Sequence, residues 1–339
     1  MLTLNAIKAA AVGAKGTPGD VLNTLLRSVL TAAPGKRLLI LDYGSVEARG
    51  VAWCAGEEAL LAVFRDPHAD VYCEMASRVY GRVITKRDPE RNRVGKPTIL
   101  GAGYGMGAPK FATYCALAQI DLAAAGVTAE QCIEAYRDAY PAIAGVKSGK
   151  YRRGGLWKGY QKAAMGAVQK GDVRTCGRCR FFARDGHLVI ELPSGREMMY
   201  RNAAVAERVP GYCAMLGLPE VPRPTLVYTH PHGYEGMLYG GLLCENIVQA
   251  ICRDLLATAI VLLEHAGLPV VLHVHDEVVC EVEKRGHEGA LREAARIMST
   301  PPKWAEGFPV VVEGFAGVRY TKAPFKEVAS VTAMCGRCE

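Results

Sequence analysis

The sequence predicts an α+β fold in which an antiparallel sheet is flanked by helices and interrupted by a mostly helical insertion. KRLLILDYG is a short apolar run that ends in Asp42, which predicts a buried strand. LPVVLHVHDEVVCEVE predicts a hairpin with Asp276 and Glu277 at its tip. Most of the long segment between these two units follows helical patterns.

The first half of this segment is expected to be helical. Residues 46–80 are rich in Ala, Glu and Leu. Asp88-Pro89 suits an N-cap followed by proline at the first helical position, so a helix is expected from Glu90 to Met106. Residues 108–171 are mostly helical as well.

The second half changes character. Residues 180–201 alternate in hydrophobicity around two Gly turns, which predicts a small antiparallel sheet. Residues 240–266 predict one long helix that is closed by Gly267.

Composition sets broad limits. The chain has 339 residues, of which 50% are apolar, enough for one large or two modest domains. The net charge of +7 suits a polyanionic partner, and equally a mildly basic enzyme. No signal-peptide core and no run of roughly eighteen apolar residues occurs, so a cytoplasmic location without a membrane partner is expected. The twelve cysteines are expected to be reduced.

Two acids stand at the ends of buried β runs. A carboxylate is costly at such a place unless it is paired or binds a metal ion. Asp42 and Asp276, brought together on neighbouring strands, could hold the two magnesium ions that phosphoryl transfer to a nucleotide requires. Taken singly, each acid is more often a turn residue at a strand end. Together they favour a metal site.

The predicted helix over Glu90–Met106 carries a mixed face. Arg93, Lys96, Leu100 and Tyr104 are spaced by three or four residues and share it. The cations suit a triphosphate, and the apolar and aromatic side chains suit a base. A solvated basic face is the alternative. Pro97 removes one backbone hydrogen bond, so a bend is expected there.

The order and wording of these segments resemble family A DNA polymerases. DYGSVEAR resembles their motif A, RNRVGKPTILGAGYG their motif B and HVHDEV their motif C. YGGLLCENIVQAICRDLL resembles the helix before motif C, particularly in bacteriophage members. The resemblance covers about Gly35 to Tyr320. It implies a palm sheet, inserted fingers, and primer–template DNA and deoxynucleoside triphosphates as partners.

The resemblance also implies roles for the acids. Asp42 and Asp276 would hold both Mg²⁺ ions, with the carbonyl of Tyr43 as a further ligand. Glu277 would support the site without binding the ions. Lys96 would hold the triphosphate and can protonate the leaving pyrophosphate.

Further residues would contact the substrates. Glu47 matches the position that excludes a ribose 2′-hydroxyl, so the implied substrate is a deoxynucleotide. Tyr104 would line the nascent base pair. His275 and Gln249 would contact the primer terminus or the nearby template.

The sequence departs from the family in motif B. The family usually has arginine where Asn92 stands, and Arg91 or Arg93 is the expected substitute. Leu100 stands where Phe or Tyr is common, which weakens stacking on the incoming base.

The resemblance implies a domain order. We expect an N-terminal helix and linker (1–35), a first palm segment with motif A (36–80), fingers with a small β insertion (81–224), a second palm segment with motif C (225–330) and a Cys-containing tail (331–339). Motif A begins near residue 40, so no thumb or exonuclease domain is expected before it. A split or minimal polymerase with a separate thumb, exonuclease or processivity chain is predicted; a truncated gene is the rival.

Two CGRC units are the other cysteine feature. Cys176, Cys179, Cys335 and Cys338 form two CxxC pairs of the type that holds structural Zn²⁺. Unpaired surface thiols or a redox pair are the alternative.

KSGKYRRGGLWKGYQK mixes cations with Tyr151, Trp157 and Tyr160. Such a mixture suits single-stranded template, although a solvated helix face with core aromatics is the more ordinary interpretation.

Two other functions remain open. A single-subunit RNA polymerase shares the architecture, but Glu47 argues against it. A catalytically weak accessory protein with a zinc site is favoured by Leu242 and Glu245, where relatives differ, and by the missing thumb. The pair Asp42 and Asp276 argues against it.

Overall fold

The chain divides into two compact units. Unit 1 comprises Met1–Val46, Cys252–Glu306 and Val310–Glu339, and unit 2 comprises Glu47–Ile251 with Gly307–Pro309. The computed structural model describes residues 27–149, 151–209, 213, 219–321, 329–335 and 337–338. The predicted N-terminal helix in 1–35 therefore lies largely outside the described residues.

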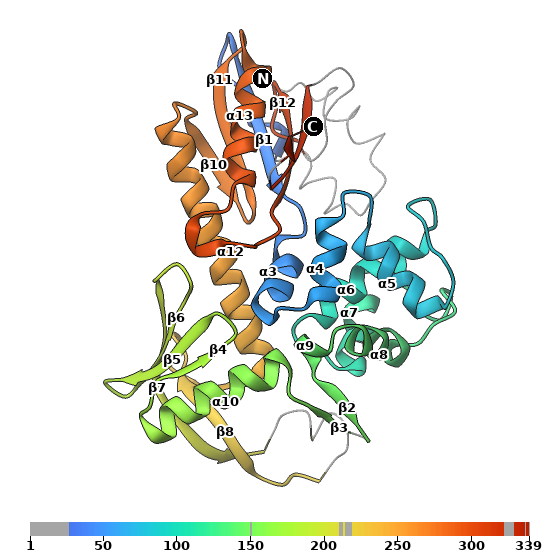
Figure 1. Ribbon diagram of the computed structural model, residues 1–339, viewed down its shortest axis with the longest axis vertical. Helices are drawn as coiled ribbons and strands as arrows, with labels where there is room; N and C mark the ends of the chain where they lie inside the picture. The colour runs from blue at the N-terminus through green and yellow to red at the C-terminus, as the bar shows by residue number, and fades with distance from the viewer. Residues whose placement is uncertain are drawn as a thin grey trace. The chain divides into compact units, whose positions relative to one another are not determined.

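Unit 1 is built on a six-stranded antiparallel sheet with the order β10-β11-β1-β12-β13-β14 (Figure 1). Its strands are β1 (Lys36–Tyr43), β10 (Val270–Val274), β11 (Glu277–Glu283), β12 (Val311–Gly317), β13 (Ser330–Met334) and β14 (Arg337–Cys338). Helix α13 (His287–Ser299) packs against β1, β12 and β13, and the short η2 (Lys303–Ala305) follows it. The core of the sheet includes Leu39 and Leu41, which are fully buried.

The segment expected to be a tail belongs to this sheet. β13 and β14 form a hairpin, and β13 pairs with β12 in register from Val311–Met334 to Phe315–Ser330. The alternating pattern in SVTAM buries Val331 and Ala333 against the unit.

Helix α12 (Gly240–His265) confirms the long helix predicted from the sequence. By length and composition it could cross a membrane, yet half of its most apolar stretch is buried inside the protein. Ile247, Val248 and Ile251 have no exposed surface. Helix α12 is therefore a core helix with the composition that its burial demands.

Unit 2 is mostly helical in its N-terminal half. Its elements there are α3 (Val46–Ala55), α4 (Glu58–Arg65), α5 (Val71–Tyr80), η1 (Arg91–Gly95), α6 (Lys96–Ala102), α7 (Ala108–Leu117), α8 (Ala129–Ala139), α9 (Pro141–Ala144), β2 (Val146–Ser148), β3 (Tyr151–Arg153) and α10 (Gly155–Lys170). Local signals define several ends: Asp70 caps α5, and Thr128 with Gln131 forms a capping box at α8.

The C-terminal half of unit 2 contains a six-stranded antiparallel sheet. Its strands are β4 (Arg174–Cys176), β5 (Cys179–Arg184), β6 (His187–Glu191), β7 (Glu197–Arg208), β8 (Arg223–Thr229) and β9 (Glu235–Leu238). The sheet predicted over 180–201 is confirmed as the centre of this larger one, and α10 packs against it (Figure 1).

The predicted α+β class is confirmed, with one local difference. The helix expected from Glu90 to Met106 is a π-helical turn followed by a short α-helix that ends at Ala102. Gly105 adopts a positive φ of 75°, which glycine permits, and so the chain turns there. The units divide after Val46 and Ile251, not at the boundaries expected at 80 and 224, and the assignment of palm and fingers stays a prediction.

Candidate active site

Carboxylates gather at one end of the unit 1 sheet. The strand register places Asp42 of β1 directly opposite Glu277 of β11 and Glu313 of β12. Directly opposed residues on antiparallel strands share a face and lie close together. Asp276 completes this group, because the N–H of Tyr43 donates to its carbonyl at 3.2 Å. We call Asp42, Asp276, Glu277 and Glu313 the acid cluster.

A tight turn presents Asp276. β10 and β11 are joined by His275 and Asp276 alone, and Val274 pairs with Glu277 across them. Two-residue hairpins need positive φ, and His275 adopts it at 53°. A residue with a Cβ rarely adopts this conformation. The turn leaves His275 exposed and Asp276 half-buried beside β1.

The cluster is electrostatically strained. Although Asp42 is exposed as a residue, desolvation of its carboxyl and the charges of Asp276, Glu277 and Glu313 raise its pKa to about 7 from 3.8. A hydrogen bond between the Asp42 and Asp276 carboxyls contributes to this rise. One proton shared by two carboxyls is the usual response to crowded negative charge.

Glu277 is tied differently. Arg27 Nη1 donates to its Oε1 at 3.3 Å, and the Tyr320 hydroxyl donates to the same atom. Arg27 Nη1 also donates to the Tyr320 hydroxyl at 2.7 Å. Burial and the charge of Glu277 raise the pKa of Tyr320. Glu277 is thus held in one orientation by an ion pair with Arg27 and a hydrogen bond from Tyr320, whereas Asp42 faces other carboxylates.

The residues present fit magnesium. In the described segments, no group of three or more His, Cys, Asp or Glu side chains is arranged to enclose a metal ion. Magnesium, however, is commonly held by one or two carboxylates together with substrate phosphates and water. The contacting carboxyls of Asp42 and Asp276 supply such oxygens, and a divalent cation would relieve the repulsion that raises the pKa of Asp42.

Unit 2 contains the expected cationic face. Arg93, Lys96 and Leu100 are exposed along η1 and α6, Leu100 by 38%. Val94 and Ile99, on the other side, are buried. A π-helical turn at Arg91–Gly95 precedes Pro97, which lies in the first turn of α6, and the bend expected at Pro97 stays a prediction. Such turns frequently mark functional sites.

Arg91 is engaged inside the unit. Its Nε and Nη2 both donate to Asp70 Oδ2, at 2.9 and 2.7 Å. The other Asp70 oxygen caps α5 through the N–H groups of Tyr72 and Cys73. Arg91 therefore fastens η1 to the start of α5, which leaves Arg93 as the more exposed arginine.

Gly95 makes this packing possible. A Cβ there would lie 2.0 Å from the carbonyl oxygen of Tyr72. Lys96 Nζ lies 6.0 Å from the centre of the Tyr72 ring. The backbone of η1 thus lies directly on α5, which fixes the direction in which Lys96 leaves the helix.

Tyr104 and Glu47 are brought together. The Tyr104 hydroxyl donates to Glu47 Oε2 at 2.9 Å. Glu47 stands in the first turn of α3, where a carboxylate is favoured by the helix dipole. Gln249 is exposed on α12 within the same unit.

Within the described residues, no metal-binding group includes the CxxC cysteines. Cys176 and Cys179 face each other across the β4–β5 hairpin of unit 2, and Cys179 is fully buried. Burial raises the pKa of the Cys179 thiol, beside Cys54 and Tyr160. Cys335 is exposed in unit 1, and the side chain of Cys338 lies outside the described residues. The zinc site stays a prediction without structural support.

The sequence pattern missed Glu313, Arg27 and Tyr320. Glu313 interrupts the apolar run VVVEGFAG, which could have marked it as a strand acid. Arg27 and Tyr320 carry no local signal, because they reach Glu277 from positions 250 and 43 residues away in the chain.

The chain is similar to known DNA polymerases. The model of DNA polymerase family A matches residues 20–185. The DNA polymerase of Bacillus phage SP02 is 31% identical over 318 residues, covering 89% of this chain and 44% of that protein. The thermostable DNA polymerase I of Thermus aquaticus is 26% identical over 82% of this chain and 26% of its own length.

A solved structure shares the fold. The POL domain of Pol1 from M. smegmatis, in complex with DNA primer-template and dNTP, matches with a TM-score of 0.55 at 17% identity, over 90% of this chain and 43% of that one. The chain thus spans less than half the length of these relatives. Three motifs in order, the family match and the shared fold show that the chain belongs to the family A DNA polymerases.

Proposed function

We propose that the chain catalyses template-directed addition of deoxynucleotides to a primer 3′-hydroxyl. Its partners would be primer–template DNA and deoxynucleoside triphosphates, the ligands in the M. smegmatis complex. The acid cluster carries the proposal, because the contacting carboxyls of Asp42 and Asp276 supply oxygens that suit Mg²⁺, and desolvation with nearby negative charge raises the pKa of Asp42. We place this activity in the cytoplasm of a bacterial or phage-infected cell.

The acid cluster divides into two roles. Asp42, Asp276 and the carbonyl of Tyr43 would hold two Mg²⁺ ions. Bound magnesium would supply Lewis acidity at the primer hydroxyl and at the leaving pyrophosphate. Glu277, held by Arg27 and Tyr320, fixes the end of β11 and so the position of Asp276.

The cationic face would bind the nucleotide. Lys96 and Arg93 are exposed and suit the triphosphate, while Arg91 positions η1 through Asp70. Leu100 offers an apolar platform to the base but no ring. Tyr104 donates a hydrogen bond to Glu47, which would hold the Glu47 carboxylate where it excludes a ribose 2′-hydroxyl.

The remaining contacts would be made with DNA. Gln249 and His275 are both exposed, as binding to the template or primer terminus requires. A separate thumb, exonuclease or processivity chain belongs to the proposal. Without such a chain, binding of primer–template should be weak and strongly salt-dependent.

Primer extension tests the proposal. The purified chain, Mg²⁺ and the four deoxynucleotides are compared with Asp276→Asn. Extension by the wild type alone supports the activity. If neither protein extends the primer, also in the presence of candidate thumb proteins, the core is inactive and the accessory interpretation replaces it.

Two finer points have their own measurements. Incorporation of ribonucleotides in preference to deoxynucleotides would favour an RNA polymerase over the role given to Glu47. Metal analysis of the purified chain tests zinc on Cys176, Cys179, Cys335 and Cys338. Absence of zinc removes that component of the proposal.

A further inference from the structure

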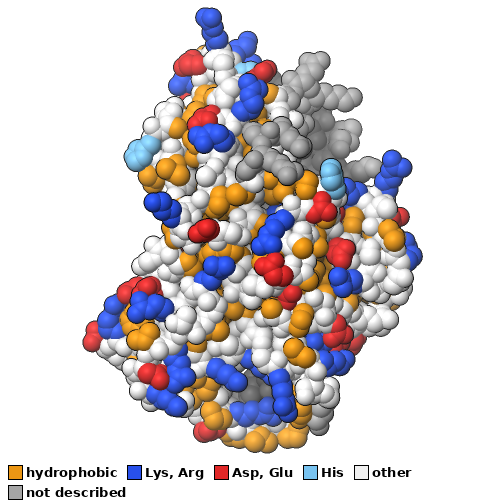
Figure 2. Space-filling view, viewed as in Figure 1, with side chains coloured by type: hydrophobic (Ala, Val, Ile, Leu, Met, Phe, Trp, Pro, Cys, Tyr) orange, Lys and Arg blue, Asp and Glu red, His pale blue; other side chains and the backbone are white. Residues whose placement is uncertain are grey.

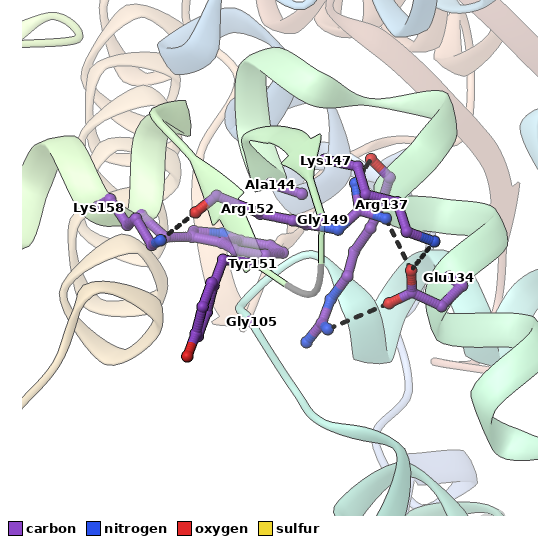
Figure 3. A pocket seen from close by; sticks show the side chains of 10 residues that line it. Gly105, Glu134, Arg137, Ala144, Lys147, Gly149, Tyr151, Arg152 and Lys158 are labelled. Atoms are coloured by element: carbon purple, nitrogen blue, oxygen red, sulfur yellow. Dashed lines mark hydrogen bonds and ion pairs between the residues drawn. The ribbon is translucent and has the colours of Figure 1, made fainter.

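A cavity of about 330 Å³ lies beside the β2–β3 hairpin within unit 2. Its walls come from α8, the hairpin, α10 and the turn after α6 (Figure 3). The volume is in the range of pockets that hold small ligands or portions of larger ones. The nucleotide-binding face does not include it, and the roles proposed above leave it unused.

The walls are strongly cationic. Arg137, Lys147, Arg152 and Lys158 line the cavity, against one carboxylate, Glu134. Glu134 is shared, because Arg152 Nη2 lies 2.8 Å from it, and Arg137 and Lys147 each lie 3.5 Å from it. Asp138 pairs with Arg152 as well, so two carboxylates oppose the four cations, and the remaining positive charge favours an anionic ligand.

The cationic groups are held in place. Arg152 is 12% exposed; it also pairs with Asp138 and donates to the carbonyl of Arg137 at 3.0 Å. The ammonium group of Lys158 donates to the carbonyl of Arg152. Figure 2 shows Lys and Arg side chains over the region of α10 and β2–β3, in the lower half of the view.

An aromatic ring stands at the edge of the cavity. Tyr151 is 66% exposed, and its ring points away from the hairpin in Figure 3. A site that binds only a phosphate group would need the cations but not an exposed aromatic ring. Exposed aromatic rings beside cations are typical of surfaces for single-stranded nucleic acid, where bases stack and phosphates meet the cations.

The cavity is joined to the end of motif B. Trp157, on its wall, donates from Nε1 to the carbonyl of Gly103 at 2.9 Å. The Trp157 ring also lies against Gly105, where a Cβ would stand 3.6 Å from it. The cavity is therefore anchored to the turn that carries Tyr104, next to where the nascent base pair is expected.

We propose that this cavity binds the unpaired template strand, with phosphates on Lys147, Arg152 and Lys158 and one base stacked on Tyr151. This inference rests on the proposed polymerase function, since it takes the strand ahead of the nascent base pair as the ligand. It adds a template site outside the three motifs.

Binding of a fluorescein-labelled single-stranded DNA of about twelve nucleotides tests the site, by anisotropy in a chelator so that no extension occurs. Tyr151→Ala should weaken binding about tenfold, and Tyr151→Phe should not. An oligonucleotide of abasic residues should bind about as weakly to the wild type as normal DNA binds to Tyr151→Ala. The variant should then cause no further loss with abasic DNA.

The cations have a separate readout. The double variant Lys147→Ala, Lys158→Ala should weaken both oligonucleotides and reduce the salt dependence by about two charges. Lys110→Ala on α7 and Tyr234→Ala at the β8–β9 turn are matched controls, since both residues are exposed in unit 2 outside the cavity. Melting curves exclude misfolding of the variants.

Several results would overturn the inference. If Tyr151→Ala loses affinity equally for normal and abasic DNA, base stacking on Tyr151 is ruled out. If the control variants lose as much affinity as the cavity variants, the cavity is not the binding site. Displacement of DNA by polyglutamate at equal charge would identify a face for acidic polypeptides instead. Asp276→Asn should bind the oligonucleotide like the wild type. If the wild type binds the oligonucleotide but does not extend a primer, that result contradicts the polymerase function and leaves the template site standing.

Discussion

The acid cluster of unit 1 holds like charges together, whereas the Arg91–Asp70 pair of unit 2 holds opposite charges together. The carboxyls of Asp42 and Asp276 are in contact, and desolvation with the neighbouring negative charges raises the pKa of Asp42. Arg91 meets the opposite charge of Asp70 with both Nε and Nη2, and the pair fastens η1 to α5. Like charges held together need a ligand, whereas opposite charges held together stabilise packing. The contrast separates the residues that we propose to take part in the reaction from those that stabilise the packing around them.

Removing one carboxylate of the cluster should have the largest effect. Asp42→Asn is expected to reduce primer extension at least about a thousandfold, because coordination of the catalytic ions is worth several kcal/mol. Steady-state primer extension measures this. Glu283→Gln, an exposed acid at the far end of β11, is the control and should stay near wild-type activity.

The Asp42→Asn variant also tests the raised pKa of Asp42. The pKa of Asp42 is higher in the folded chain than in the unfolded chain, so folding takes up a proton between about pH 4 and pH 7. Stability of the chelated wild type should therefore fall as pH rises through this window. Asp42→Asn should lose most of this slope, and added Mg²⁺ should restore stability above pH 7. A slope unchanged in the variant would contradict the assignment.

Gly95→Ala should disrupt the packing of η1 on α5, which the Arg91–Asp70 pair supports. The added Cβ would lie 2.0 Å from the Tyr72 carbonyl, so η1 must move away from α5 at a cost of about 3 kcal/mol. Chemical denaturation measures the loss. Gly289→Ala in α13, where a Cβ meets nothing within 4 Å, should be neutral or slightly stabilising. Equal effects would mean that the contact of η1 with α5 is not tight.

Lys96→Ala should impair nucleotide binding without unfolding the chain. Loss of one ionic contact to phosphate is worth about 2 kcal/mol, or roughly a thirtyfold lower kcat/KM for deoxynucleotides. Lys110→Ala, a second exposed lysine of unit 2, should leave kcat/KM unchanged. If both variants behave alike, the cationic face acts only through general charge.

Tyr104→Phe should have the smallest effect. It removes the hydrogen bond to Glu47 but keeps the ring, which costs about 1 kcal/mol. Discrimination against ribonucleotides should weaken by about fivefold, because Glu47 is less fixed. Single-nucleotide incorporation measures the ratio. Unchanged discrimination would show that Glu47 is positioned by other contacts.

The sequence by itself determined the strand that carries Asp42, the hairpin whose turn carries Asp276, the long helix α12 and the exposed face with Arg93, Lys96 and Leu100. These follow from apolar runs, turn signals and helical spacing, which are local properties. Motif B was predicted one turn too long, because its glycines permit a turn whose direction the local pattern does not contain.

Only the tertiary structure decided which side chains meet. Glu313 lies beside Asp42 because β12 pairs with β1, and Arg27 reaches Glu277 across 250 residues. Arg91 and Arg93 are both arginines of the same turn, yet Arg91 forms an ion pair with Asp70, which stands 21 residues earlier in the chain. Strand pairing and ion pairing join distant segments, and hydrophobic periodicity records only the environment of each segment. The two CGRC units show the same limit, since Cys179 of the first is buried in unit 2 whereas Cys335 of the second is exposed in unit 1.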